Sequence, residues 1–312
     1  LFSEKIQELK DRIASVIVGQ EQTVDLVLTA ILANGHVLIE GVPGVAKTLL
    51  ARLTARLIDA DFSRVQFTPD LMPSDVLGTT VFNMKTNGFD FHQGPIFADI
   101  VLVDEINRAP AKTQAALFEV MEERQISIDG TTHRMGDLYT ILATQNPVEQ
   151  EGTYKLPEAQ LDRFLMKITM DYPSLEEEVN ILERHHTNAA LVKLDDITPA
   201  ITKEELLSLR AFMNQVFVDR TLLQYIALIV QQTRTSKAVY LGASPRASVA
   251  MLQSSKAYAL LQGRDFVTPE DIKFVAPYVL QHRLILTAEA EMEGYSPVKV
   301  TQRLIDKVEV PK

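Results

Sequence analysis

The sequence GVPGVAKTLL, at residues 41–50, decides the fold. It follows the apolar segment HVLIE (36–40) and leads into an amphipathic helical pattern. A glycine-rich loop between a strand and a helix is the context in which backbone N–H groups bind phosphate. Gly41 and Lys47 stand in the G-x-x-x-x-G-K-[ST] register, whereas Ala46 replaces its second glycine. The stretch predicts a phosphate-binding loop, the alternative being a tight turn with a surface lysine.

The first half of the chain alternates strand-like and helical patterns. Short apolar runs rich in Val, Ile, Leu and Thr occur at residues 36–40, 63–68, 99–105, 138–144 and 165–170. Helical patterns lie between them at residues 20–33, 47–59, 110–123 and 157–162. This alternation predicts an α/β fold with a five-stranded parallel sheet that carries helices on both faces.

The second half of the chain is predominantly helical in pattern. Thr202 and Glu205 have the spacing of a capping box, which marks the start of one amphipathic helix. We therefore expect an α/β core over residues 1–172 and a smaller all-α domain over residues 173–312. The final stretch, residues 296–310, alternates weakly and is expected to form a strand or hairpin.

Polar side chains follow two of the predicted strands. Asp104 and Glu105 come directly after the apolar run IVLV, and the carboxyl end of a buried strand faces the ligand crevice of an open α/β sheet. There Asp104 and Thr48 would hold Mg²⁺, Glu105 would polarise an attacking water, and Lys47 would reach the β- and γ-phosphates. Asn146 follows the next strand, where its amide could bond a phosphate or water, or simply begin an Asn-Pro turn.

Charge and composition limit the class of protein. The net charge is −10, and residues 1–172 hold 15 Lys and Arg against 24 Asp and Glu, which argues against a broad nucleic-acid surface. The absence of cysteine excludes disulfides and thiol chemistry. No apolar run is long enough for a membrane span, and the first residues carry no signal-peptide core. We therefore expect a cytoplasmic protein.

The adjacent His185 and His186 point about 100° apart on a helix and are not expected to share a metal.

Four segments together make the sequence similar to one family. GVPGVAKT, IVLVDEINRAP, ILATQNPVEQEGTYKLPEAQLDRF and LGASPRAS resemble the MoxR family of AAA+ ATPases. The resemblance implies a P-loop AAA+ core with a helical lid, ATP and Mg²⁺ as cofactors, and a homo-oligomeric ring, most often a hexamer. It also implies a chaperone-like role on client proteins, often with a von Willebrand factor A domain partner. The alternatives are a magnesium-chelatase-type motor subunit, a DNA-linked ring ATPase and a nucleotide-gated scaffold.

The resemblance also implies a role for each matched residue. Asp104 and Glu105 correspond to Walker B and Asn146 to sensor 1. Alanine is common at the Ala46 position in this family, so the loop is expected to be a working one. The Walker A nucleotide-binding loop comprises Gly41, Val42, Pro43, Gly44, Val45, Ala46, Lys47, Thr48 and Leu49.

Residues outside these strands complete the implied site. Arg163 corresponds to an arginine finger that acts on ATP held by the neighbouring subunit, and Arg246 corresponds to sensor 2 on the lid. By spacing alone, an arginine of this kind is more often solvated or ion-paired. The segment Val18-Gly19-Gln20 corresponds to the N-terminal segment that lies against adenine in this family.

The core is expected to carry two inserts that face the centre of the ring or a partner. One falls at about residues 69–97, and the other is a hairpin at about 125–135, where the Asp129-Gly130 pair is an independent turn signal. Phenylalanines gather around the first insert. They are expected to pack in the core, the alternative being an apolar face for a partner. They are Phe62, Phe67, Phe82, Phe89, Phe91 and Phe97.

Overall fold

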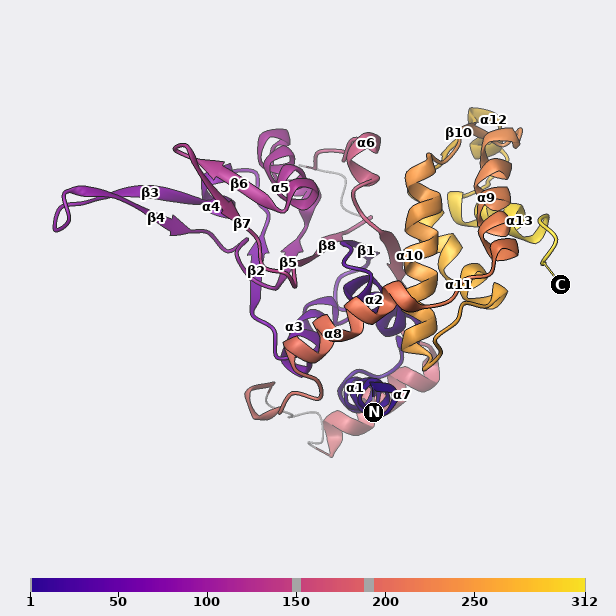
Figure 1. Cartoon of the computed structure of the whole chain (residues 1–312), viewed down its shortest axis with the longest axis horizontal. Coiled ribbons are helices and arrows are strands. Elements are labelled where there is room, and N and C mark those ends of the chain that lie inside the picture. The colour runs from indigo at the N-terminus through magenta and orange to yellow at the C-terminus, as the bar shows by residue number, and fades with distance from the viewer. Residues whose placement is uncertain (1, 148–152, 188–193, 312) are drawn as a thin grey trace.

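A five-stranded parallel sheet lies at the centre of the fold, as predicted (Figure 1). The computed structural model describes residues 2–147, 153–187 and 194–311; residues 148–152, part of the run that carries the family resemblance, lie outside these ranges. The strand order is β2-β5-β8-β1-β9, and neighbouring strands pair in parallel. The strands are β1 (Val37–Gly41), β2 (Phe62–Gln66), β5 (Ile100–Asp104), β8 (Thr140–Gln145) and β9 (Met166–Met170).

Helices cover both faces of this sheet, because its central strands are apolar on both sides. All five residues of β5 are buried, which is the pattern of a strand covered by helices on each face. Two hydrophobic clusters result, one on each face, and the second contains the buried rings of Phe118 and Phe164. The helices of this part are α1 (Phe2–Val16), α2 (Glu21–Leu32), α3 (Lys47–Leu57), α4 (Pro73–Leu77), η1 (Ile106–Arg108), α5 (Ala111–Glu123) and α6 (Glu158–Leu161).

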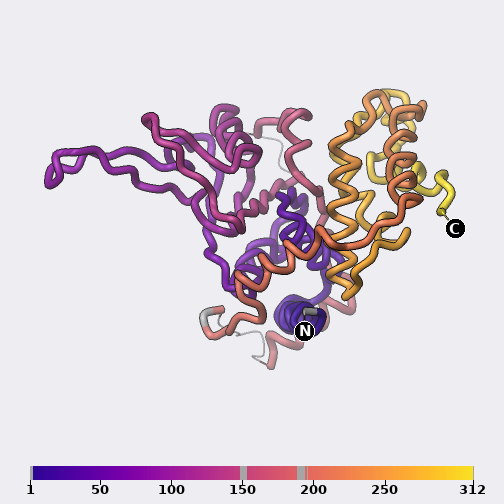
Figure 2. The backbone as a smooth tube through the Cα atoms, in the orientation of Figure 1, coloured from indigo at the N-terminus to yellow at the C-terminus, as the bar shows by residue number. Residues whose placement is uncertain are grey.

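Two hairpins extend from the sheet. Strands β3 (Gly78–Asn83) and β4 (Gly88–Gln93) form a long ribbon that projects away from the body of the molecule (Figures 1 and 2). Strands β6 (Gln125–Ile128) and β7 (Thr131–Arg134) pair across Asp129 and Gly130, whose φ angles of 50° and 80° are left-handed. The turn therefore lies where the Asp-Gly pair predicts it.

The six phenylalanines divide into two groups. Phe67 is fully buried, and Phe62, Phe91 and Phe97 pack against the hydrophobic core, so the core interpretation holds for these four. Phe82 and Phe89 are 47% and 74% exposed on the β3–β4 hairpin. Their rings form an edge-to-face pair with centroids 5.3 Å apart. This exposed pair leaves an apolar surface on the hairpin.

The described residues of the second half of the chain form a mainly helical assembly. Val239–Leu241 (β10) and Ile285–Leu286 (β11) form a short antiparallel pair that an all-α prediction misses. The prediction of a strand or hairpin at residues 296–310 was wrong. These residues contain the helix α13, which is capped by Ser296. Val300 and Leu304 are buried at helical spacing, which favours a helix over a strand. The remaining elements are α7 (Leu175–His186), η2 (Leu194–Asp196), α8 (Lys203–Phe212), η3 (Met213–Gln215), α9 (Arg220–Thr235), α10 (Pro245–Leu261), α11 (Pro269–Leu280), α12 (Ala288–Met292) and α13 (Pro297–Asp306).

The segment after α11 ties the second half of the chain to the edge of the sheet. The side-chain amide of Gln281 donates to the carbonyl of Lys167 in β9 at 2.5 Å. A ring nitrogen of His282 lies 3.0 Å from the Phe164 carbonyl oxygen. Arg283, only 5% exposed, donates to that same carbonyl at 2.8 Å.

Among the described residues, no helix has the length and apolar character that a membrane crossing requires.

Two buried histidines make the fold acid-sensitive. Burial, followed by the charge of Arg124, lowers the pKa of His36 to about 3; burial and the charge of Arg283 also hold the pKa of His282 well below its usual value. The folded chain keeps both rings neutral, whereas the unfolded chain protonates them below about pH 6.5. The contribution of the two neutral histidines to the free energy of unfolding is therefore fully present above this pH, and it is lost as the pH falls below it. Between pH 7 and 5.5 we expect a loss of about 2 kcal/mol for the pair.

Urea denaturation at the two pH values checks this expectation. His186→Gln, at an exposed position, controls for the loss of a histidine at the surface. A free energy of unfolding that stays constant from pH 7 to 5.5 would contradict the account.

Candidate functional site

The loop that the sequence predicts to bind phosphate connects β1 to α3. Lys47 is the first residue of α3, and its Nζ donates to the Gly41 carbonyl at 2.7 Å. Gly44 has a left-handed φ of 88° and is exposed. The first N–H groups of a helix have no partner within the helix, and the helix dipole adds positive potential there. We call residues 41–49 the P-loop; they place amide donors and a lysine at one point on the sheet edge.

Ala46, the departure from the usual glycine, has a left-handed backbone with φ 60° and ψ 23°. An L-residue pays about 1–2 kcal/mol for this conformation, more than the roughly 0.5–1 kcal/mol by which glycine destabilises an ordinary helix position. We therefore expect Ala46→Gly to raise the free energy of unfolding by about 0.5–1 kcal/mol. Chemical denaturation measures it, with Ala115→Gly on the exposed face of α5 as the matched control.

Ala115 lies inside a right-handed helix, where glycine should cost about 1 kcal/mol. The two substitutions are thus expected to change stability in opposite directions. A loss of stability in Ala46→Gly as large as that in Ala115→Gly would show that position 46 carries no backbone strain.

Asp104 lies at the carboxyl end of β5 and is 7% exposed. Its Oδ1 accepts a hydrogen bond from the Thr144 hydroxyl at 3.0 Å. Its Oδ2 accepts from Nε of Arg64, on the neighbouring strand β2, at 2.6 Å. The carboxylate is therefore fixed by partners on both adjacent strands.

Glu105, the next residue, turns away from the strand with a left-handed φ of 55°. Its backbone N–H donates to the Thr144 hydroxyl at 3.0 Å. Its Oε2 accepts from the side-chain amide of Gln66 at 2.7 Å and pairs with Nε of Arg108 at 3.0 Å. A non-glycine residue in this conformation is uncommon and concentrates at functional sites.

The P-loop and these acids share one edge of the sheet. β1, β8 and β5 are adjacent parallel strands, so the P-loop, Asn146 and the two acids all follow their carboxyl ends. Asn146 is 7% exposed. Burial lowers the pKa of Lys47, and the charges of Asp104 and Glu105 oppose that shift, which places all three groups in one electrostatic environment. The four predicted side chains therefore lie along the edge of the sheet at which an open α/β fold binds its ligand.

A cavity of about 210 Å³ opens beside the P-loop. Its walls are mostly apolar and come from three parts of the chain: the segment between α1 and α2, the P-loop, and helix α7. Figure 1 shows α1 and α7 side by side, and Arg184 Nη1 donates to the Ser15 carbonyl at 2.7 Å. The lining residues are Val16, Ile17, Val18, Gln20, Val45, Ala46, Leu49, Pro173, Ile181, Arg184 and His185.

Of the segment predicted to lie against adenine, Val18 and Gln20 line this cavity and Gly19 does not. Gly19 has a left-handed φ of 68°, and a Cβ at this position would collide with the carboxylate of Glu177 at the start of α7. The glycine thus lets the segment pass close to α7. An apolar cavity with a few polar groups, next to a set of amide donors, is suited to a flat ring attached to a phosphate chain.

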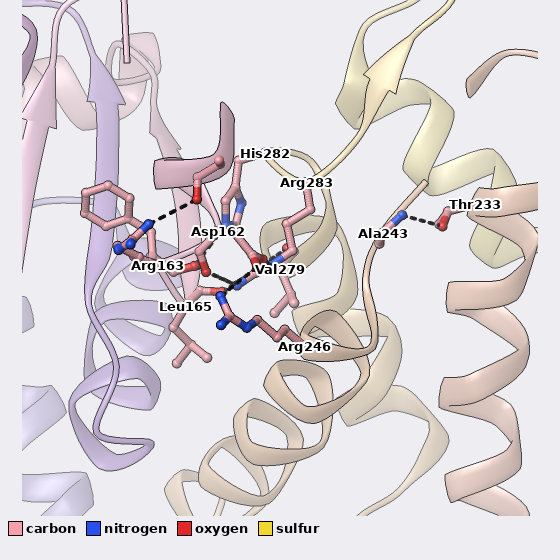
Figure 3. Close-up of polar contacts among 11 residues, drawn as sticks. Asp162, Arg163, Leu165, Thr233, Ala243, Arg246, Val279, His282 and Arg283 are labelled. Atoms are coloured by element: carbon pink, nitrogen blue, oxygen red, sulfur yellow. Dashed lines mark hydrogen bonds and ion pairs between the residues drawn. The ribbon is translucent and has the colours of Figure 1, made fainter. Parts of the chain in front are cut away.

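Arg163 and Arg246 come together at a different place (Figure 3). Arg163 Nη2 pairs with Oε2 of Glu122, at the end of α5, at 2.6 Å. Arg246, in the first turn of α10, lies 3.5 Å from the other oxygen of Glu122 and 3.8 Å from Asp162. Asp162 is held by Nε of Arg283 at 2.6 Å. Neither Arg163 nor Arg246 lines the cavity beside the P-loop.

Comparisons with known proteins agree with this geometry. Residues 36–166 match the model of the ATPase family associated with various cellular activities (AAA), and residues 231–306 match the AAA lid domain. The chain is 44% identical to Chaperone MoxR1 of Mycobacterium tuberculosis, over 95% of this chain and 80% of that protein. The chain belongs to the MoxR family of AAA+ ATPases. It thus has the P-loop AAA+ core and AAA lid that the motifs predict.

Two further relatives cover nearly the whole of this MoxR-family chain. It is 47% identical to the uncharacterized protein YeaC of Bacillus subtilis, over 96% of this chain and 93% of that protein. A crystal structure of a protein from Cytophaga hutchinsonii, proposed to be an ATPase, superposes with a TM-score of 0.91 at 41% identity. The alignment covers 100% of this chain and 96% of that one.

Several partners of the predicted residues in this MoxR-family site do not follow from the motifs. Arg64 and Gln66 follow from strand order: β2 lies beside β5, so its last residues face the two acids. The strand-like run at residues 63–68 indicates that these residues lie on a strand. It does not indicate that this strand lies beside β5. Glu122 and the cavity side of α7 carry no local motif and emerge only from the packing of distant segments.

Proposed function

We propose that this chain is an ATP phosphohydrolase whose active site is completed by a second copy of the chain. The observation that carries the proposal is the convergence of the P-loop, Asp104, Glu105 and Asn146 at one edge of the sheet. Each group suits one task in phosphoryl transfer: amide donors and a lysine for phosphates, acids for a cation and for water, and an amide for orientation. Membership of the MoxR family supports the same conclusion.

The nucleotide would lie across the P-loop. Residues 41–49 offer backbone N–H groups to the phosphates, and Lys47 exchanges its bond to the Gly41 carbonyl for the β- and γ-phosphate oxygens. The base occupies the cavity between the P-loop and α7, against Val18, with Gly19 shaping that wall. The apolar lining suits the faces of a purine ring.

The residues present fit a magnesium ion. Mg²⁺ prefers oxygen ligands and keeps several of its waters, so one carboxylate and one hydroxyl beside the phosphates are sufficient. Asp104 and Thr48 supply these groups. When bound, the ion would neutralise charge on the β- and γ-phosphate oxygens. Arg64 pairs with Oδ2 of Asp104 and orients that carboxylate.

In the reaction we propose, a water molecule attacks the γ-phosphorus directly. Glu105 accepts the proton of that water through its carboxylate, and Asn146 orients the water or the γ-phosphate. The bond between the γ-phosphorus and the bridging oxygen to the β-phosphate breaks, and ADP leaves. Lys47 offsets the charge that develops on the phosphate oxygens.

The position of the two arginines supports a shared site. Arg163 and Arg246 lie together around Glu122 and outside the cavity beside their own P-loop. We therefore propose that both act on ATP held by a neighbouring copy, Arg163 as the arginine finger and Arg246 as sensor 2. A head-to-tail interface of this kind generates a ring when its rotation closes, and we propose a hexameric ring.

The proposed cellular role is chaperone-like remodelling of partner proteins in the cytoplasm. The name Chaperone MoxR1, given to a 44% identical relative, supports it. The exposed Phe82 and Phe89 on the projecting hairpin offer a surface for a client protein. We also propose a partner with a von Willebrand factor A domain. The acidic core favours protein partners over nucleic acid.

Substitution of Lys47 tests this function. We expect Lys47→Ala to reduce ATP hydrolysis to background and to weaken binding of a fluorescent ATP analogue at least about tenfold, because the loop loses its only side-chain cation at the phosphates. Lys112, exposed in the first turn of α5, gives a matched control in Lys112→Ala. Full hydrolysis by Lys47→Ala would disprove the proposal.

A further inference from the structure

Glu122 contacts both arginines of the proposed shared site. Its Oε2 lies 2.6 Å from Nη2 of Arg163, and its Oε1 lies 3.5 Å from Nη2 of Arg246. These partners come from three separate parts of the chain: the end of α5, the segment after α6, and the first turn of α10. One carboxylate thus joins an arginine of the core to an arginine of the lid.

Helix stability does not explain where these charges lie. Glu122 occupies the last turn of α5, which contains no basic residue, and Arg246 occupies the first turn of α10, which contains no acid. A carboxylate at a helix C-terminus and a cation at an N-terminus each oppose the helix dipole. The two charges therefore destabilise their own helices slightly, and each is offset by the other across the boundary between core and lid.

A second carboxylate completes the frame around Arg246. Asp162 lies 3.8 Å from Nη1 of Arg246. Asp162 is also fixed by the nearly buried Arg283 (Figure 3). Arg163 is also held by the Ala159 carbonyl at 3.2 Å. The side chain of Arg246 nevertheless remains 68% exposed. The arrangement leaves a guanidinium available at the surface while its position is limited by two acids.

We propose that Glu122 is the positioning residue that holds Arg163 and Arg246 together as one unit for the γ-phosphate of ATP on the neighbouring copy. The inference rests on the proposed function. Two guanidinium groups that contact the same side chain repel each other, and the carboxylate between them offsets that repulsion. Fixing both beforehand removes the entropic cost of bringing each to the transition state. Glu122 touches no substrate and acts only through the arginines.

The position of α5 adds a structural link between two sites. The helix begins at Ala111, six residues after Glu105, and ends at Glu123, next to Glu122. One rigid helix therefore connects the acids of one site to the arginines that serve the next.

Glu122→Gln tests the assignment, because it keeps the shape of the side chain and removes its charge. We expect kcat for ATP to fall about tenfold while KM changes less than about twofold, since the variant's own P-loop is intact. Glu123→Gln, on the same exposed turn, is the matched control and should keep both constants within about twofold of wild type. Thermal melting of both variants verifies that they are folded.

Mixing two variants separates positioning from a local structural role. Glu122→Gln keeps its P-loop and weakens its arginines, whereas Lys47→Ala loses its P-loop and keeps its arginines. Mixed rings contain interfaces that combine the intact half of each, so the mixture should exceed the summed activities of the two variants severalfold. A defect confined to the variant's own site would gain nothing from mixing.

Three results would overturn the assignment. The first is a Glu122→Gln protein as active as Glu123→Gln, and the second is a slow Glu122→Gln protein whose activity is not raised by mixing. The third is wild-type activity in both Arg163→Ala and Arg246→Ala. That last result would refute the shared arginine site of the proposed function itself. The first two results would refute only the role of Glu122, and in those cases Arg163→Ala and Arg246→Ala should still be inactive.

Discussion

Replacement of Glu105 by Gln is expected to lower kcat for ATP hydrolysis by about two to three orders of magnitude. The amide keeps the size and the hydrogen-bonding reach of the side chain but cannot accept a proton from water. The carboxylate is held by Gln66 at 2.7 Å and Arg108 at 3.0 Å, so it is already oriented before ATP binds. The loss should therefore fall on the chemical step.

Binding and turnover must be measured side by side for this variant. We expect Glu105→Gln to bind a fluorescent ATP analogue within about threefold of wild type, because the P-loop contacts are unchanged. Glu119→Gln, an exposed acid on α5, controls for the general effect of removing one negative charge. Hydrolysis by Glu105→Gln at the rate of Glu119→Gln would show that another group activates the water.

Replacement of Arg163 by Ala is expected to reduce kcat about a thousandfold. An arginine that reaches the γ-phosphate stabilises charge that appears only in the transition state, so KM should change far less than kcat. Arg163→Lys should restore little, because an ammonium group lacks the planar pair of donors. The exposed Arg220→Ala on α9 is the control for loss of an arginine elsewhere.

Unfolding would not explain such a loss. The ion pair between Arg163 and Glu122 is partly exposed, with side chains 26% and 37% accessible. Pairs of this kind contribute about 0.2–1 kcal/mol, so the melting temperature should move by only a few degrees. If Arg163→Ala keeps more than about half of the wild-type kcat, the arginine finger assignment is wrong.

Much of the fold was predictable because its signals are local. Short apolar runs bounded by helical patterns marked all five strands of the sheet, and their burial on both faces produces that pattern. The P-loop, Asp104 and Glu105 could be predicted because each follows directly after such a run. Asn146 follows the same rule at the end of β8.

The contacts between these residues were not predictable from periodicity. Hydrophobic spacing indicates which face of an element is buried, but it does not say which elements become neighbours. The bond from Arg64 to Asp104 depends on β2 lying beside β5, and the cavity depends on α7 folding back against α1. Residues 296–310 were misread because Val298 and Val300 alternate like a strand, whereas the helical spacing of Val300 and Leu304 decides the packing.

We propose that ATP is hydrolysed at a site shared between copies of the chain. Its most direct test is the steady-state ATPase rate per subunit as a function of protein concentration, with the oligomeric state followed by light scattering. We expect a rate per subunit that rises steeply as rings assemble and then levels off. A rate per subunit that stays constant down to concentrations at which only monomers scatter light would contradict it.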